Sequence, residues 1–320
     1  MPAPPNTPSR VQVARFSHCQ HYGRASVRAE VRRSGRRRQS TCDSTGATVS
    51  SAITSLTHGQ YQTVYNVFSF ALASMLFTSI FLLVSQGRVL PRYRQALVIS
   101  AMVCGIAAYH YIRIFNSFNE AYLPTTLGGD YALSPMGFNE AYRYVDWLLT
   151  VPLLLLETVA VLALPKVTRA SLLNKLIPAS ALMIVLGYPG EIAADTAPKM
   201  IWGALSTIPF LFILYVLFVQ LTKSLDRQSP EVSATVGRLR LLLIATWGVY
   251  PISFLFPVFG LDGSDAFVAR QVGYSVADVL AKCLYGLVIY KIARMKSADD
   301  NPAFAADEFE DEPASARTAA

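Results

Sequence analysis

Seven apolar segments occupy most of the chain after residue 60, and each approaches the ~20 residues that a helix needs to cross a lipid bilayer. No other feature restricts the fold as strongly, because every backbone polar group inside a bilayer must be paired, and a helix pairs them within one segment. The connections are short except for residues 117–138, whose Pro, Gly and Thr content predicts a structured loop or small hairpin. We therefore predict an all-α membrane protein, a seven-transmembrane-helix bundle. The segments are expected at about 61–86, 93–116, 139–163, 168–189, 198–222, 237–258 and 268–294.

The net charge of +7 belongs to the N-terminal tail and not to the apolar part of the chain. Residues 1–50 contain nine arginines and two acidic residues, and nine minus two accounts for the whole +7. The rest of the chain is therefore balanced, which argues against a nucleic-acid-binding protein. The tail is rich in Arg, Ser, Thr and Pro and poor in acids, a composition typical of an organelle transit peptide or a disordered basic arm.

Charge and hydropathy together divide the chain into three parts: a basic tail at 1–55, a seven-helix domain at 56–296 and an acidic, disordered tail at 297–320. Basic residues gather in the odd-numbered loops, whereas acidic residues dominate the even-numbered ones. By the positive-inside rule, the odd loops and the C-terminus are cytoplasmic and residue 60 is outside. The Arg-rich tail would then lie outside, although the positive-inside rule favours basic segments on the cytoplasmic side. Its removal during targeting, for example to an organelle membrane of a eukaryote, would resolve that conflict.

The four cysteines give no indication of a disulfide framework or a zinc site. Cys19 and Cys42 lie in the N-terminal tail, whereas Cys104 and Cys283 lie within apolar segments. Their spacing does not match that of metal ligands, so we expect no bound metal.

The last apolar segment carries two charged residues, Asp278 and Lys282, near its middle. Because they are four residues apart, they share one helical face. A charge at mid-bilayer depth costs at least ~2.5–3.5 kcal/mol on insertion scales, so each residue needs a partner or a function. One interpretation is a buried ion pair that stabilises the bundle. The other is that Lys282 forms a Schiff base with an aldehyde and that Asp278 is part of its counterion.

The third segment places polar residues along one helical face. Asp146 and Glu157 differ by about 20° in azimuth and by roughly 16 Å in height, with Thr150 between them on the same face. Arg143 lies one turn outward of Asp146. Such a stripe either stabilises helix packing or forms a proton relay. Arg143 and a protonated Schiff base would favour the Asp146 carboxylate, whereas desolvation after four leucines favours the neutral acid at Glu157.

Three motifs together resemble one known family. The residues at 143–152, 247–251 and 278–282 match the third, sixth and seventh helices of microbial (type 1) rhodopsins. The match covers roughly residues 60–295. Within the family, the chain most resembles the proteorhodopsin and xanthorhodopsin group of outward proton pumps. The resemblance implies a seven-helix bundle with retinal in its core, and a light-driven ion transporter in place of an enzyme. It favours the Schiff-base interpretation of the lysine over the structural ion pair.

The resemblance also implies a role for individual positions. Lys282 would bind all-trans-retinal as a protonated Schiff base, Asp146 would be counterion and proton acceptor, and Asp278 would be the second carboxylate. Arg143 would gate the extracellular side, and Glu157 would be the internal proton donor. Residues expected to contact the retinal are Trp147, Trp247, Tyr250, Pro251 and Leu154, the last of which corresponds to green-absorbing forms.

The nature of the ion and of a second pigment also follows from the resemblance. Asp146, Thr150 and Glu157 match the Asp-Thr-Glu set of proton pumps, whereas sodium and chloride pumps carry other residues there. His110 matches the histidine that proteorhodopsins place beside the counterion. There it would share a proton or hydrogen bond with Asp146. The alternative is a core histidine whose hydrogen bonds are satisfied, which is often the case for an isolated histidine. Gly203 resembles the glycine that opens a slot for a hydroxylated carotenoid in xanthorhodopsin-type pumps, although glycine also serves close helix packing.

Three other functions make different demands on the sequence. A light sensor would share the pocket, but a slow signalling photocycle has little use for a cytoplasmic donor such as Glu157. A light-gated channel would need more polar residues, and the leucine run at 153–156 argues against a continuous pore. A retinal-free receptor would show no visible absorbance after addition of retinal. The expected partners are the lipid bilayer, protons and further copies of the chain in a homo-oligomer.

Overall fold

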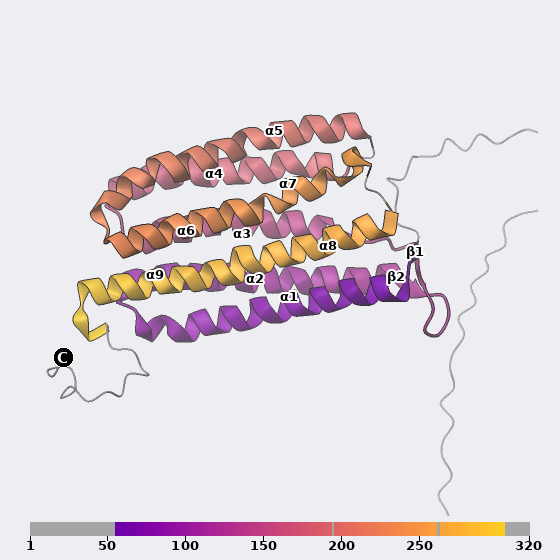
Figure 1. Cartoon of the computed structure of the whole chain (residues 1–320), viewed down its shortest axis with the longest axis horizontal. Helices are drawn as coiled ribbons and strands as arrows, with labels where there is room; N and C mark the ends of the chain where they lie inside the picture. Colours follow the sequence, from indigo (N-terminus) through magenta and orange to yellow (C-terminus); the bar gives the residue numbers. More distant parts are fainter. Residues whose placement is uncertain (1–54, 194, 261–262, 305–320) are drawn as a thin grey trace, which may run out of the picture. The chain divides into compact units, whose positions relative to one another are not determined.

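Seven helical spans that are long and apolar enough to cross a membrane are present in the computed structural model, which describes residues 55–193, 195–260 and 263–304. Each span overlaps one predicted segment, so the prediction of an all-α seven-helix bundle is confirmed (Figure 1). The spans are His58–Arg88, Pro91–Ala121, Ala141–Val161, Lys166–Glu191, Thr196–Asp226, Pro230–Phe254 and Gly263–Asp300. The predicted basic tail before Ser55 and the predicted acidic tail after Phe304 lie outside the described residues.

The first four spans are nearly continuous, whereas the last three are interrupted. The first four are α1 (His58–Val84) with η1 (Ser85–Arg88), α2 (Pro91–Ala121), α3 (Ala141–Val161) and α4 (Lys166–Glu191). The fifth consists of α5 (Thr196–Tyr215), η2 (Val216–Gln220) and η3 (Thr222–Arg227), and the sixth of α6 (Pro230–Trp247) and α7 (Val249–Phe254). The seventh consists of α8 (Gly263–Val279), η5 (Leu280–Leu284) and α9 (Tyr285–Asp300). Short turns follow the last two spans: η4 (Phe256–Phe259) and η6 (Pro302–Phe304).

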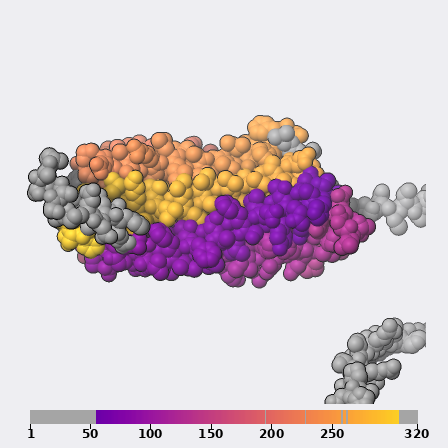
Figure 2. Space-filling model, turned by 60° about the horizontal axis from the view of Figure 1, so that its bottom comes forward, coloured from indigo at the N-terminus to yellow at the C-terminus, as the bar shows by residue number. Residues whose placement is uncertain are grey.

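Helices that follow one another in sequence pack side by side, from α1 on α2 through α4 on α5. The seventh span closes the bundle, because α8 contacts α1 and α9 contacts α2 and α6. Figure 2 shows this closure from outside, with α1 in indigo next to the last span in yellow. The seventh span therefore faces α2 and α3, and the buried charged residues of α3 and of the seventh span come together.

Two of the interruptions occur where the sequence places residues of the predicted site. α6 ends before Gly248, and Pro251 in α7 has no N–H group with which to bond the carbonyl of Trp247. In the seventh span, η5 is a π-helical turn that contains Lys282. π-Helical turns inside α-helices are frequent at functional sites. The local backbone thus departs from regular helix at the positions that the motifs single out.

A three-stranded antiparallel sheet lies beside the bundle, in the order β1-β3-β2. It is formed by β1 (Ser55–Leu56), β2 (Tyr122–Pro124) and β3 (Tyr131–Leu133), with Leu123 opposite Ala132. β2 and β3 form the hairpin that the sequence predicts within 117–138. Tyr61 of α1 stacks on Tyr131, with 3.7 Å between the ring centroids, which attaches the sheet to the bundle. We call the end of the bundle that carries these strands the sheet end.

The two largest differences between predicted and observed helix boundaries are at the end of the seventh span and at the start of the sixth. α9 continues to Asp300, although the last segment is predicted to end at about 294, because contacts with α2 support the extra turns. Ser297 is buried, and the hydroxyl of Tyr93 donates a hydrogen bond to Asp300. The sixth span begins at Pro230, earlier than predicted, with Ser229 as its N-cap. Proline is favourable in a first helical turn, where its missing N–H group costs nothing.

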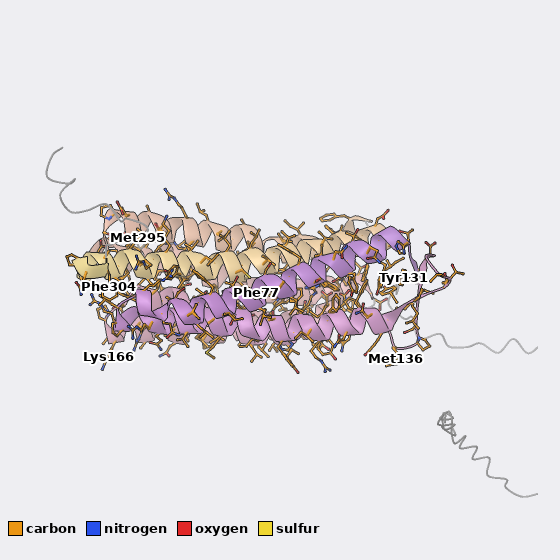
Figure 3. All side chains as sticks on the ribbon, turned by 90° about the horizontal axis from the view of Figure 1, so that it is seen from below. Phe77, Tyr131, Met136, Lys166, Met295 and Phe304 are labelled. Atoms are coloured by element: carbon orange, nitrogen blue, oxygen red, sulfur yellow. The ribbon has the colours of Figure 1, made fainter. Side chains whose placement is uncertain are left out.

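Large apolar side chains cover the outside of the bundle, and charged side chains lie inside it. Phe77, labelled in Figure 3, is 67% exposed, and Ile208 on the fifth span is 66% exposed. The buried charged residues include Arg143, Asp146, Glu157, Asp278 and Lys282. This distribution is the reverse of a soluble protein's and is expected of a bundle that is surrounded by lipid.

Candidate functional site

A cavity of about 950 Å³, its open mouth included, lies among α3, α4, α5, α6, α7 and the seventh span. Most of its wall is apolar and aromatic: Trp147 packs against Tyr250 and Tyr274, with 4.8 Å and 5.8 Å between ring centroids. Thr207 of α5 and Pro251 of α7 line the cavity and are exposed, so the mouth lies between these helices. All seven residues predicted to contact a cofactor line the cavity: Lys282, Trp147, Leu154, Trp247, Tyr250, Pro251 and Gly203.

Lys282 brings a buried amine to the wall of this cavity. Its Nζ lies 2.9 Å from Asp146 Oδ2 and forms a second ion pair with Asp278. Asp146 comes from α3 and Asp278 from α8, one turn before the lysine. The interior therefore holds one cation between two carboxylates, beside an apolar cavity.

The two carboxylates differ in how firmly they are held. Asp278 accepts hydrogen bonds from Tyr250 at 2.6 Å, from Tyr111 at 2.8 Å and from the Trp147 indole at 3.4 Å. Asp146 Oδ2 faces Lys282, whereas its Oδ1 has no hydrogen-bond partner within the described part of the chain. Asp278 is thus fixed by several donors, while Asp146 keeps an oxygen that is free to receive a proton.

Arg143 connects this ion cluster to the sheet end. Its guanidinium lies 3.5 Å from Asp278 Oδ2 and donates to Tyr111 at 3.2 Å and to Gln271 Oε1 at 2.8 Å. Gln271 in turn donates to Glu140 Oε1 at 2.8 Å, immediately before α3 begins. A continuous chain of polar contacts therefore leads from Asp278 through Arg143 and Gln271 toward the sheet end.

Glu157 lies on the same helix as Asp146 but eleven residues further on, away from the sheet end. Its side chain is completely buried, and Ser100 Oγ donates a hydrogen bond to its Oε2 at 2.5 Å. Its Oε1 has no hydrogen-bond partner among the described residues. The leucines at 154 and 155 are buried beside it on α3. The carboxyl group of Asp146 thus lies beside a buried cation, whereas that of Glu157 lies in apolar surroundings.

Two other predicted residues, Thr150 and His110, are buried nearby. Thr150 donates through Oγ1 to the main-chain oxygen of Asp146 at 2.9 Å and not to its carboxyl group. His110 is buried on α2, and its Nδ1, like Asp146 Oδ1, has no hydrogen-bond partner in the described residues. These two atoms therefore do not bond each other, and the predicted link between His110 and Asp146 stays a prediction.

Three residues of the site escaped the sequence analysis: Ser100, Tyr111 and Gln271. A signal for the first two was present, because Ser100 and Tyr111 are eleven residues apart on α2, the same spacing as Asp146 and Glu157 on α3. Eleven residues make about three helical turns, so two adjacent helices with this spacing can pair their polar positions at two levels. Gln271 had no comparable signal.

The site fits a retinal that is bound to a lysine. The observation that tests the fit is a buried primary amine in the wall of a large, aromatic-lined cavity, with two carboxylates beside it. The amine can hold an aldehyde covalently, the carboxylates can balance its charge, and flat rings can enclose a polyene. Lys282, Trp147, Leu154, Trp247 and Tyr250 would form most of these contacts.

Comparisons with known proteins agree with this geometry. Residues 62–295 match the family model described as bacteriorhodopsin-like protein. Green-light absorbing proteorhodopsin from a gamma-proteobacterium (EBAC31A08) is 32% identical over 229 residues, which cover 71% of this chain and 85% of the relative. The match thus extends over all seven spans except their outermost residues.

Two solved structures are more similar still in sequence. The crystallographic structure of xanthorhodopsin, described as a light-driven ion pump with dual chromophore, is 49% identical with a TM-score of 0.73, and covers 78% of this chain and 98% of that one. The crystal structure of thermophilic rhodopsin is 43% identical with a TM-score of 0.75, and covers 78% and 99%. With the buried lysine, its carboxylates and the aromatic cavity, these matches show that the chain belongs to the bacteriorhodopsin-like family, the retinal-binding microbial rhodopsins that include light-driven proton pumps.

Proposed function

We propose that the chain exports protons when illuminated, with all-trans-retinal held on Lys282, Asp146 as proton acceptor and Glu157 as proton donor. One observation carries this proposal: Lys282 Nζ lies 2.9 Å from Asp146 Oδ2, while Glu157 is buried about three turns away on the same helix. An acceptor beside the nitrogen and a donor on its other side are the two groups that a one-way proton transfer requires.

When bound, retinal supplies light absorption and an isomerisation that alters the orientation and proton affinity of the Lys282 nitrogen. Both carboxylates contact the Lys282 nitrogen, Asp278 more closely than Asp146. Asp146 is the available acceptor for a proton leaving that nitrogen, since its Oδ1 is unpartnered among the described residues. Asp278 holds its several hydrogen bonds and stays ionised, so it balances charge and does not compete for the proton.

Glu157 returns a proton to the Lys282 nitrogen from the opposite side. Its apolar surroundings and single hydrogen bond from Ser100 favour the neutral carboxylic acid, which is the form that a donor must have. Arg143 separates the ion cluster from the chain of polar groups that leads to Glu140, and so controls the exit at the sheet end. His110, buried near the cluster, and Thr150, bonded to the Asp146 backbone, adjust the proton affinity of Asp146.

The direction of transport depends on the orientation in the membrane. Basic residues in the odd loops support a cytoplasmic C-terminus and an outside sheet end. Protons then leave through the Arg143 side and enter on the Glu157 side. The proposal includes a location in an organelle membrane of a eukaryote, reached with loss of the basic tail. It also includes assembly of the chain into a homo-oligomer.

Light-driven pH change in intact cells that express the chain tests the proposed pump. Illumination should acidify the medium, and a protonophore should abolish the change. Alkalinisation would reverse the proposed direction, and no light response from retinal-loaded protein would refute pumping.

A hydroxylated carotenoid antenna is a second part of the proposal. Gly203 lines the cavity near its mouth, and a Cβ atom at this position would lie 3.2 Å from the Phe254 ring. The absence of a side chain at Gly203 therefore keeps the cavity accessible between α5 and α7, where a carotenoid ring could approach the retinal. Purified protein mixed with lutein or zeaxanthin should show sharpened carotenoid bands and a carotenoid peak in the action spectrum. The Gly203→Trp variant should show neither the carotenoid bands nor the carotenoid peak, but should still bind retinal. If the variant shows both signals, Gly203 serves helix packing only.

A further inference from the structure

Three hydroxyl groups on one face of α2 each contact a different carboxyl group. Residues seven and eleven positions apart on a helix differ by only about 20° in azimuth, so the three lie in one row. The pairs are Tyr111 with Asp278, Ser100 with Glu157, and Tyr93 with Asp300. The first two pairs belong to the proton path proposed above. The third lies at the end of the bundle opposite the sheet and has no assigned function.

Tyr93 is the centre of a cluster that joins three parts of the chain, which we call the Tyr93 clamp: Arg92, Tyr93, Gln228, Lys296 and Asp300. The Tyr93 hydroxyl donates to Asp300, which also forms an ion pair with Arg92. Lys296 donates to Gln228, directly after η3, and its Nζ lies 5.4 Å from the centroid of the Tyr93 ring. The clamp therefore connects the start of α2, the end of α9 and the end of the fifth span.

The clamp lies over the route from that end of the bundle to Glu157. Tyr93 is buried, and the fully buried Leu97 follows one turn deeper on α2. Ser100, which bonds Glu157, is about 10.5 Å from Tyr93 along the helix axis. A proton that reaches Glu157 along α2 must therefore pass the Tyr93 ring and Leu97. These apolar groups bind no proton, and their packing excludes the water that could transfer one.

The contacts of the clamp suit a closure that opens reversibly. Asp300 faces cations from two helices, Arg92 of α2 and Lys296 of α9, and the acidic Asp299 also acts on Lys296. These cations hold Asp300 as a carboxylate, so it is bound in the clamp and poorly suited to collect protons. Arg92 and Asp300 are both partly exposed, and ion pairs of this kind are individually weak. Such a cluster can separate without unfolding the helices.

We propose that the Tyr93 clamp is the gate of the proton-uptake path, and that it must open before Glu157 can be reloaded. This inference rests on the proposed role of Glu157 as donor. Closed, the clamp keeps water away from the apolar segment around Glu157 and so preserves one-way transport. Open, it exposes the row of α2 that leads to Ser100.

Time-resolved proton uptake tests the gate in the full-length protein, loaded with retinal and reconstituted in vesicles. Uptake after a flash is followed with a pH-sensitive dye on the Glu157 side, and amide hydrogen exchange of residues 92–97 is measured in the dark. Tyr93→Phe removes the hydroxyl and keeps the ring, and Asp300→Asn removes the charge. Asp299→Asn is the matched control, because Asp299 is the neighbouring exposed carboxylate and makes no hydrogen bond or ion pair within the described residues.

Both clamp variants should speed uptake and amide exchange about three- to tenfold, the factor for loss of one hydrogen bond, while Asp299→Asn changes neither. Unchanged uptake and exchange in both variants would overturn the gate. Slower uptake in Asp300→Asn would also overturn it, because Asp300 would then collect protons. In a Glu157→Gln background the faster amide exchange should remain. If Glu157→Gln alone leaves uptake unaltered, the donor assignment fails, and the exchange result still decides whether the clamp closes this end.

Discussion

The two halves of α3 place a carboxyl group in opposite environments. Asp146 lies beside the Lys282 amine, next to a network in which Asp278 accepts hydrogen bonds from two tyrosines, a tryptophan and Lys282 itself. Glu157 lies eleven residues away among leucines, with Ser100 as its hydrogen-bond donor. An ionic environment stabilises a carboxylate, whereas an apolar one stabilises the neutral acid. One helix can thus favour a carboxylate at one position and a neutral acid at another because its neighbours differ.

Lys282→Ala removes the group on which both halves act and should have the largest effect. The visible absorption band should be lost completely after addition of retinal, because no covalent link can form. Absorption spectra of purified protein measure this. Lys175→Ala is the control, since that lysine bonds Gln220 on the outer part of the bundle and should leave the band unchanged. A coloured Lys282→Ala protein would refute the proposed attachment site.

Asp146→Asn tests the ionic half. It removes a charge 2.9 Å from the amine, so pumping should fall by at least ~10²-fold and the absorption maximum should shift to the red. Acidification of the wild-type protein should produce the same red shift, since protonation removes the same charge. Normal pumping by Asp146→Asn would show that another group accepts the proton, and Asp278 would be the next to test.

Glu157→Gln tests the apolar half, because it keeps the shape of the side chain and removes the proton. Reprotonation of the Lys282 nitrogen should slow about 10²-fold, while transfer to Asp146 keeps its rate. Added azide should restore the slow step by carrying protons past the missing donor. Flash photolysis measures both steps, and Glu231→Gln, an exposed glutamate at the start of α6, is the matched control. Equal rates in the variant and the wild type would contradict the donor assignment.

Leu154→Gln should have the smallest effect and separates colour from proton transfer. Leu154 is buried between the two halves and lines the cavity. An amide dipole beside the retinal should move the absorption maximum from green to blue and leave the direction of pumping unchanged. Absorption and pH measurements on one preparation test both statements. An unmoved band would exclude Leu154 from contact with the chromophore.

Hydropathy and composition predicted the number of spans and a structured loop or hairpin, whereas the resemblance to a known family predicted seven of the residues that line the cavity. The spans and the buried charges were predictable for a physical reason. A bilayer requires continuous apolar helices, and charged residues inside them are rare enough to stand out. Asp146, Glu157, Asp278 and Lys282 were therefore visible as outliers. The last helix runs to Asp300, beyond the predicted end of the segment at about 294, because the last turn of α9 is stabilised by contacts with α2 that no local pattern records.

What only the tertiary structure decided is which neighbour each charged residue has. Helical periodicity places Asp146 and Glu157 on one face, but the packing of α2 and the seventh span gives Asp278 its tyrosine donors and Glu157 its serine. Serine and tyrosine occur in many helices without such roles, so their contacts become evident only when the helices are assembled. The sequence by itself determined which chemical groups lie inside the bundle, an amine and three carboxyl groups. Helix packing determined which charge state those carboxyl groups favour, because desolvation and hydrogen bonding depend on neighbours from distant segments.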